Sequence, residues 1–117
     1  MESETTVNRI INLTGQRVCV YDKSNTLLEA WMPTPDKDKI DYKLISVKCN
    51  SIDGAPITSI HCEMSNLPDP KLNTYYIVNR VIATHTDRND FLVPIRIHDN
   101  DDSDEFIACG GFFINFR

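Results

Sequence analysis

The chain has 117 residues, of which 41% are hydrophobic and 25% are charged, values typical of one globular domain rather than a disordered chain. The net charge of −5 is uneven: five of the 17 acidic residues lie in HDNDDSDE (98–105), and 17 minus 5 leaves 12 against 12 basic residues. No basic cluster is present, so DNA and RNA are not expected as partners, whereas one small anionic ligand is compatible with the sequence.

Two short strands, or one strand with an irregularity, are predicted at the start of the chain. They are IINL (10–13) and RVCVYD (17–22), separated by Thr14-Gly15-Gln16. DKSN (22–25) consists of residues that favour turns, so TLLEAW (26–31) should return as the second strand of a hairpin. PTPDKDK (33–39), with two prolines, is expected to be a loop.

The clearest alternation of apolar and polar residues lies in ISVKC (45–49) and TSIHCEM (58–64). A period of two residues predicts strands with one buried and one solvent-exposed face. Because NSIDGAP (50–56) contains Asp-Gly, the two strands should form a hairpin with a longer loop. NLPDPKLN (66–73) is a proline-marked connection to the next strand.

A strand–helix–strand unit is predicted over YYIVNRVIATHTDRNDFLVP (75–94). Tyr75–Val78 lacks alternation, as expected of a strand covered on both sides, and Asn79 is a favourable N-cap for a helix that ends near Arg88. Phe91 begins a new strand that Pro94 interrupts. The intervening chain is long enough for a right-handed parallel crossover.

The last strands, FIAC (106–109) and FFINF (112–116), are expected on either side of Gly110-Gly111. The predicted fold class is therefore α+β: a strand-dominated mixed sheet of about eight short strands and hairpins, with one short helix in the strand–helix–strand unit near residues 75–94. We expect a single domain over 1–117, with residues 1–6 frayed and 98–105 forming a mobile acidic loop.

Metal binding is not expected from this sequence. The four cysteines contain no CxxC pair, and each lies in an apolar or alternating run, which favours buried free thiols at Cys19, Cys49, Cys62 and Cys109. Asp99, Asp101 and Ser103 alternate like the start of a calcium loop, but the central glycine and the final glutamate of such a loop are missing.

An enzyme is not predicted either. Nucleophilic catalysis needs a serine or cysteine beside a histidine that a carboxylate orients, and His61, His85 and His98 offer no such set. No cofactor is expected. No apolar run reaches the roughly 18–20 residues of a membrane helix, and the polar, acidic start MESETTVN (1–8) is unlike a secretory signal, so we expect a cytoplasmic protein without a membrane partner.

The junction between the predicted strand and helix is the candidate ligand site. Unpaired N–H groups in a first helical turn attract anions, and Arg80 could add a bidentate contact to a phosphate. Ligands bind beyond the carboxyl ends of parallel strands, where Asn79 and Arg80 should lie. Since no glycine-rich phosphate loop is present, the alternative stays open that Asn79 is only a helix cap and Arg80 an exposed side chain.

Two further arginines, Arg88 and Arg96, could converge with Arg80 on the same ligand. The aromatic residues that could stack on a ring there are Tyr75, Tyr76 and Phe91. The three arginines could equally be separate, solvated surface charges, and spacing along the chain does not decide between these readings.

Six short motifs follow one another along the chain: IINLT (10–14), LPDP (67–70), TYYIV (74–78), DRND (87–90), LVP (92–94) and ACGGF (108–112). In this order they resemble a group of small phage proteins that open with an INLT motif, which is identified as including the phage anti-Thoeris sponge proteins. Those proteins bind cyclic ADP-ribose isomers and, in some members, cyclic oligonucleotides. The resemblance covers most of the chain, and only the combination of motifs is specific.

The resemblance implies a homodimer or higher homo-oligomer that acts in the host cytoplasm and sequesters its nucleotide signal without cleaving it. On this reading Asn79, Arg80, Arg88 and Arg96 contact the ligand, Asn89 contacts a ribose, and Phe91 or a neighbouring tyrosine such as Tyr76 stacks. The sequence departs from the family pattern at three places: Gly15-Gln16 replaces Pro-His, Asn79 replaces serine, and Gly110 replaces arginine. If the arginine that Gly110 replaces contacts a phosphate, this chain should differ from the family in ligand or affinity.

Two other functions fit the same sequence. One is a small protein–protein interaction module that inhibits a host factor through an exposed sheet edge or the acidic loop. The other is an enzyme that degrades the same nucleotides, in which case the histidines would matter. Binding followed by release of intact ligand distinguishes a sponge from both.

Overall fold

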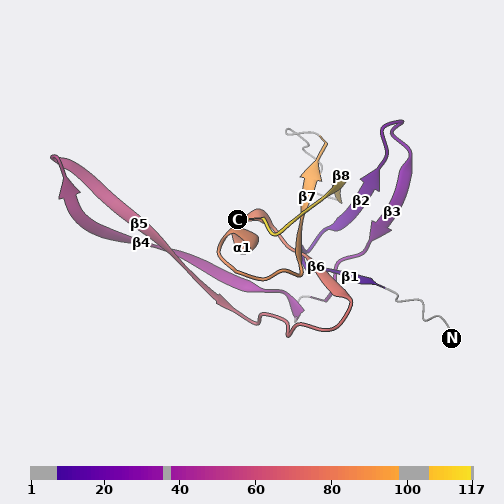
Figure 1. Ribbon diagram of the computed structural model, residues 1–117, viewed down its shortest axis with the longest axis horizontal. Coiled ribbons are helices and arrows are strands. Elements are labelled where there is room, and N and C mark those ends of the chain that lie inside the picture. Colours follow the sequence, from indigo (N-terminus) through magenta and orange to yellow (C-terminus); the bar gives the residue numbers. More distant parts are fainter. Residues whose placement is uncertain (1–7, 36–37, 98–105, 117) are drawn as a thin grey trace.

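The computed structural model describes residues 8–35, 38–97 and 106–116. The segment predicted to be frayed and the acidic segment 98–105, with its calcium-like pattern and His98, lie outside the described residues. The described part contains eight strands and one short helix, as the predicted fold class requires (Figure 1). The strands are β1 Arg9–Asn12, β2 Arg17–Tyr21, β3 Leu27–Trp31, β4 Asp41–Ile52, β5 Ala55–Ser65, β6 Thr74–Ile77, β7 Phe91–Arg96 and β8 Phe106–Ile114.

Six of the strands form a mixed, nearly closed, barrel-like sheet in the order β1-β6-β7-β8-β2-β3, which we call the body together with the helix. β2 and β3 form the predicted antiparallel hairpin, and the irregularity at 14–16 separates β1 from β2 as two strands. The outermost strands β1 and β3 approach each other through a parallel bridge between Asn12 and Pro33. This near-closure removes most of the exposed edge that an open sheet would have.

The predicted strand–helix–strand unit is confirmed, because β6 and β7 pair in parallel on either side of helix α1, Arg80–Thr84. The helix is shorter than predicted and does not reach Arg88. His85 takes the C-cap position, with its backbone N–H bonded to the Ile82 carbonyl at 3.2 Å. Thr86 and Asp87 then follow, and both residue types favour turns over helix interiors.

Two hydrophobic clusters lie on opposite faces of the sheet, so β6 is covered on both sides as predicted. Tyr76 and Val78 belong to a cluster that α1 covers, whereas Ile77 points into the other. That second cluster takes side chains from five strands, which is the arrangement of a barrel interior. Its members are Ile10, Val18, Val20, Trp31, Ile77, Ile107, Cys109 and Phe112.

Strand β8 is continuous, so the predicted break at Gly110-Gly111 is wrong. Against β7, Arg96 pairs with Cys109 and Pro94 with Phe112, which leaves one extra residue on β8 and defines a bulge. Gly111 has φ +151°, a conformation that residues with a Cβ rarely adopt. Pro94 does not end β7 either, because it lies at this irregular pairing, where its missing N–H costs little.

The remaining strands, β4 and β5, form a separate antiparallel hairpin that extends far from the body (Figure 1), and we call it the arm. Its turn is shorter than predicted: only Asp53 and Gly54 connect the strands, with φ of 51° and 81°, as in a two-residue type I′ turn. The arm is anchored at its base, where Ile40 is buried and Met64 packs against the body.

The prediction of one buried face on the arm is wrong for the single chain. Nearly every residue of β4 and β5 is exposed. The prediction of four buried thiols therefore holds only in the body, where Cys19 and Cys109 are buried, whereas Cys49 is exposed and Cys62 half-buried on the arm.

Candidate functional site

The predicted N-cap is confirmed at the end of β6. Asn79 has extended backbone angles, and its Oδ1 accepts a hydrogen bond from the Ile82 N–H at 2.9 Å. Its carbonyl accepts from the Ala83 N–H at 3.2 Å. Because α1 has only five residues, its dipole is too small to hold an anion, and any anion site at this junction must use side-chain charge.

Next to this junction, Asn12 fixes the chain between β1 and β2. Its side chain is 1% exposed. Oδ1 accepts from the backbone N–H of Thr14 at 2.9 Å and from the Thr14 hydroxyl at 2.7 Å, while Nδ2 donates to the carbonyls of Gln16 at 2.6 Å and Trp31 at 2.9 Å. The Leu13 N–H donates to the Ile77 carbonyl at 2.9 Å, so the turn at 14–16 is held beside the end of β6.

Between this turn and the helix lies an open cleft of about 550 Å³, at the carboxyl ends of the parallel strands β1 and β6. This is the position at which parallel sheets bind ligands. The residues that line the cleft are Thr14, Gln16, Tyr42, Val78, Asn79, Arg80, Val81, Val93, Pro94, Arg96 and Ile107. The cleft therefore brings together three of the predicted site residues, Asn79, Arg80 and Arg96.

Among the described residues, the lining of the cleft carries two positive charges and no carboxylate, although the chain as a whole has a net charge of −5. Both arginines are exposed. The Arg80 guanidinium lies over the Phe116 ring, with Cζ 5.5 Å from the ring centroid, which is a cation–π contact that leaves its N–H groups able to bind an anion. Buried Val78, Val93 and Ile107 form an apolar floor.

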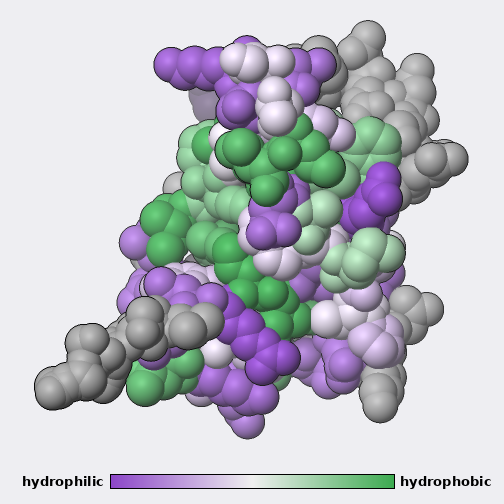
Figure 2. All heavy atoms as spheres, turned by 90° about the vertical axis from the view of Figure 1, so that its right-hand side faces the viewer, coloured by the Kyte–Doolittle hydropathy of each residue, from purple (hydrophilic) through white to green (hydrophobic). Residues whose placement is uncertain are grey.

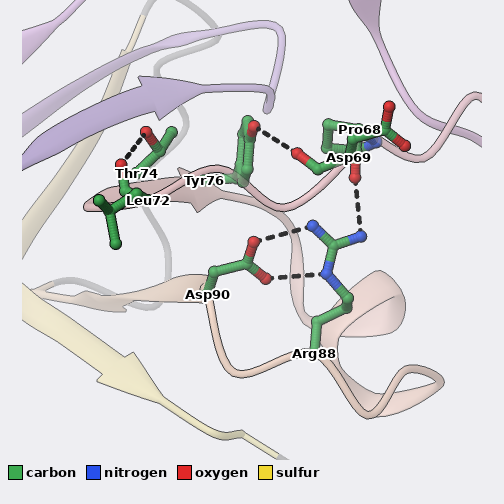
Figure 3. A network of polar contacts seen from close by, with 7 residues as sticks. All are labelled: Pro68, Asp69, Leu72, Thr74, Tyr76, Arg88 and Asp90. Atoms are coloured by element: carbon green, nitrogen blue, oxygen red, sulfur yellow. Dashed lines mark hydrogen bonds and ion pairs between the residues drawn. The ribbon is translucent and has the colours of Figure 1, made fainter.

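Three other predicted site residues belong to a different cluster: Tyr76 and Arg88, drawn in Figure 3, and Phe91, whose ring contacts both of them. Arg88 donates to both carboxylate oxygens of Asp90, at 2.9 and 2.8 Å, and to the Pro68 carbonyl at 2.8 Å. Its guanidinium lies over the Phe91 ring at 4.7 Å. Arg88 thus ties the chain after α1 to the connection 66–73 and has a structural role.

The aromatic residues of this cluster are not accessible to a ligand. Phe91 is 2% exposed and Tyr76 3% exposed, so neither ring can stack on a base without opening the core. The Tyr76 hydroxyl donates to the Asp69 carbonyl at 3.1 Å, and burial, reinforced by the Asp90 carboxylate, raises its pKa. Asn89 is exposed, adjoins this cluster, and is not among the residues that line the cleft.

The ring that does line the cleft is Tyr42, at the base of the arm, which is 40% exposed. Sequence reasoning missed it, together with Thr14 and Gln16. The IINLT motif pointed to the turn at 14–16, but nothing in the local sequence around Tyr42 indicates that β4 begins beside α1.

The three departures from the family pattern fall at two different places. Gln16 and Asn79 line the cleft, whereas Gly110 borders a separate hollow with Tyr21 and Ile97. Glycine at 110 therefore removes no charge from this cleft.

Comparison of the chain with protein-family models, with curated proteins and with solved structures gives no significant match. The family resemblance therefore rests on the sequence motifs alone. Across residues 8–35, 38–97 and 106–116, no group of three or more His, Cys, Asp or Glu side chains is placed to hold a metal ion. Within the same ranges, no helix has the length and apolar character needed to cross a membrane.

Proposed function

We propose that this protein binds an anionic nucleotide signal in the cleft and sequesters it without cleaving it, as a phage-type anti-defence sponge would. The ligand class is a cyclic ADP-ribose isomer, with cyclic oligonucleotides as the wider alternative. The observation that carries the proposal is that Arg80 and Arg96 lie in one cleft of an acidic chain, and that no carboxylate lines this cleft within residues 8–35, 38–97 and 106–116.

The chemistry of the cleft matches the parts of such a ligand. Arginine is suited to bidentate contacts with a pyrophosphate, and Arg80 and Arg96 would supply them. Tyr42 would stack on a base, an interaction that tolerates different bases. Thr14, Gln16 and Asn79 surround these groups with polar atoms suited to ribose hydroxyls and base edges. A volume of about 550 Å³ is typical of small-molecule sites.

Binding without turnover is supported by what lines the cleft in the described part of the chain. No histidine, cysteine or carboxylate is among these residues, so no general base or activated nucleophile faces a ligand there. Cys109 belongs to the same hydrophobic cluster as Ile107, and burial raises the pKa of its thiol, which keeps it in the unreactive protonated form.

The test is depletion and recovery of ligand. The protein is mixed with a panel of cyclic ADP-ribose isomers and cyclic di- and trinucleotides, free ligand is followed by chromatography, and the protein is then denatured by heat. We expect one ligand to disappear and to return intact. Return as cleavage products would make the protein an enzyme, and no depletion at all would favour the interaction module.

The arginines are tested by calorimetric titration of the depleted ligand. Each hydrogen bond to a charged group is worth about 1.5–3 kcal/mol, so Arg80→Ala and Arg96→Ala should each weaken binding by roughly 10- to 150-fold. Arg9→Ala removes the same charge from an exposed position outside the cleft and should change affinity less than about threefold. Unchanged affinity in both cleft variants would show that the ligand binds outside this cleft.

A further inference from the structure

Arg80 and Arg88 are held in different ways, although each guanidinium lies over an aromatic ring. Arg88 donates to both carboxylate oxygens of Asp90 and to the Pro68 carbonyl, so its nitrogen atoms already serve as donors within the fold. Within the described residues, no carboxylate forms an ion pair with Arg80, and its guanidinium lies over the ring of Phe116. An aromatic ring attracts a cation without taking up its N–H groups. Arg80 therefore combines a held position with donors that a ligand can use.

Phe116 is itself fixed from two sides. Its half-buried ring packs against the hydrophobic cluster that α1 covers. It also contacts the ring of Phe113, with 5.4 Å between the ring centroids and 47° between the ring planes. A ring that packs against a core and a second ring has few alternative positions, so it offers Arg80 a fixed surface.

The backbone at Asn115 lies between the end of β8 and this ring. β8 ends at Ile114, and Asn115 has φ 57°, in the left-handed region. Asparagine adopts this conformation more readily than most residues with a Cβ, whereas β-branched residues adopt it least. The segment after β8 turns there and lies beside α1 (Figure 1), where Phe116 contacts the first residue of the helix.

Partial exposure alone does not single out Phe116. On the side of the β2–β3 hairpin, apolar and polar residues are mixed (Figure 2), and Leu27 and Leu28 of β3 are 52% and 60% exposed. Scattered apolar side chains of this kind are ordinary on a protein surface. Phe116 differs from them because a charged residue of the cleft lies over its ring.

An exposed arginine binds less tightly when the ligand has to immobilise it. Each flexible side chain that binding must order lowers affinity by about 2- to 12-fold. A ring that already holds the guanidinium removes part of this cost before the ligand arrives. Arg96, the other arginine of the cleft, is also exposed, but within the described residues its guanidinium lies over no aromatic ring. The two arginines should therefore differ in how far they are ordered before binding.

We propose that Phe116 is a positioning residue of the cleft, which holds the Arg80 guanidinium ready for the phosphate groups of the ligand. The inference rests on the proposed function, because that function assigns Arg80 to the anion. It adds that affinity depends on a ring that is not among the residues lining the cleft. Phe116 acts on the ligand only through Arg80.

The position of Arg80 is tested first without any ligand, by NMR of its Nε–H group. A proton near the face of an aromatic ring resonates at lower frequency than one in solvent, and Arg80→Lys identifies the signal by its loss. In Phe116→Leu, which keeps an apolar side chain but has no ring, the signal should move toward that of a solvated arginine. In Phe116→Tyr it should stay near its native position. An unchanged signal in Phe116→Leu would overturn the proposal.

The effect on binding is measured by NMR titration with inorganic pyrophosphate. Phe116→Leu should weaken binding by about 3- to 10-fold, within the range for ordering one side chain, and Phe116→Tyr should bind within about twofold of the unmodified protein. Phe106→Leu is the matched control, because Cζ of Arg17 lies 5.4 Å from the centroid of the Phe106 ring and neither residue lines the cleft. This control should change affinity by less than about twofold. Circular dichroism verifies that the variants are folded.

A second pair of variants leaves the ring unchanged. Asn115→Val strains the left-handed backbone before Phe116, so it should weaken pyrophosphate binding as Phe116→Leu does. Asn115→Gly adopts the same backbone without strain and should retain the affinity. Equal affinity in these two variants would contradict the proposed placement of the ring by Asn115.

The outcomes separate this inference from the proposed function. If Arg80→Ala weakens pyrophosphate binding and Phe116→Leu does not, the anion binds at Arg80 and the positioning role of Phe116 is wrong. If Phe106→Leu weakens binding as much as Phe116→Leu, the effect is not specific to Arg80 and the positioning role is again wrong. If Arg80→Ala binds as the unmodified protein does, or if the unmodified protein does not bind pyrophosphate, the proposed function and this inference are both overturned.

Discussion

Asn12 connects three parts of the chain through one buried amide. Its four hydrogen bonds hold the turn that lines the cleft and reach β3 on the other side of the nearly closed sheet. The asparagine of the IINLT motif thus has a structural role that is independent of any ligand. The shape of the cleft wall at Thr14 and Gln16 depends on it.

Asn12→Ala should destabilise the protein by about 2–4 kcal/mol, because it leaves buried polar groups of the turn and of Trp31 without partners. Urea denaturation followed by tryptophan fluorescence measures this. Thr14→Val is the comparison, since it removes one hydroxyl from a half-buried site and should cost less. A loss below about 1 kcal/mol for Asn12→Ala would mean that water replaces the amide.

The titration of Tyr76 makes the protein less stable at alkaline pH. Burial, followed by the Asp90 carboxylate, raises its pKa above the ordinary value of 10.0. The folded protein therefore holds the hydroxyl proton of Tyr76 more tightly than the unfolded chain does. The contribution of Tyr76 to the free energy of unfolding is complete below pH 10 and is lost as pH rises through the pKa of the folded state. Between pH 8 and pH 11 the free energy of unfolding should fall.

The variant Tyr76→Phe should reduce that fall, as measured by urea denaturation at both pH values. Tyr42→Phe is the comparison, because it removes the same hydroxyl from a ring that is 40% exposed. If Tyr76→Phe and the unmodified protein show the same pH dependence, groups other than Tyr76 cause the fall in the free energy of unfolding.

At the scale of single residues, the sequence predicted the Asn79 cap correctly, because a strand–helix junction indicates it locally. Arg80 and Arg96 both line the cleft, and their contact with a ligand stays a prediction. The sequence could not place Arg88 and Phe91. Arg88 contacts its sequence neighbours Asp90 and Phe91, but its bond to the Pro68 carbonyl and the burial of Phe91 in the core come from tertiary contacts. Tyr42 was missed for the same reason.

At the scale of secondary-structure elements, β8 depends on one glycine. Gly111 supplies the conformation of the bulge, whereas Gly110 has no positive φ, and an added Cβ would meet nothing within 4 Å at either residue. The two glycines therefore differ in backbone conformation and not in available space.

Gly111→Ala should cost about 1–3 kcal/mol through backbone strain, and Gly110→Ala should change stability by less than about 0.5 kcal/mol. Thermal unfolding of the two variants measures the difference. Equal effects would show that the bulge relaxes around an alanine.

Short sequence motifs predicted the existence of helices and strands more accurately than they predicted the residues at which these elements end. The Asp-Gly dipeptide identified the turn of the arm, and Asn79 identified the start of α1. The ends were wrong where a strand continues through residues that usually stop it: β8 passes two glycines and β7 passes Pro94, because neighbouring strands fix their path.

At the scale of the whole molecule, the class of fold was predictable from the number and type of elements. The order of strands was not, since the parallel pairing of β1 with β6 and of β2 with β8 joins segments far apart in sequence. The buried face predicted for the arm was wrong, because β4 and β5 pair only with each other and nearly all of their residues are exposed.

The two-residue turn of the arm has a kinetic consequence. Hairpins with short turns form within about 1–10 µs, whereas β1 can pair with β6 only after the chain has brought Arg9 beside Thr74. In a newly made or refolding chain, the arm therefore forms well before the strands of the body pair.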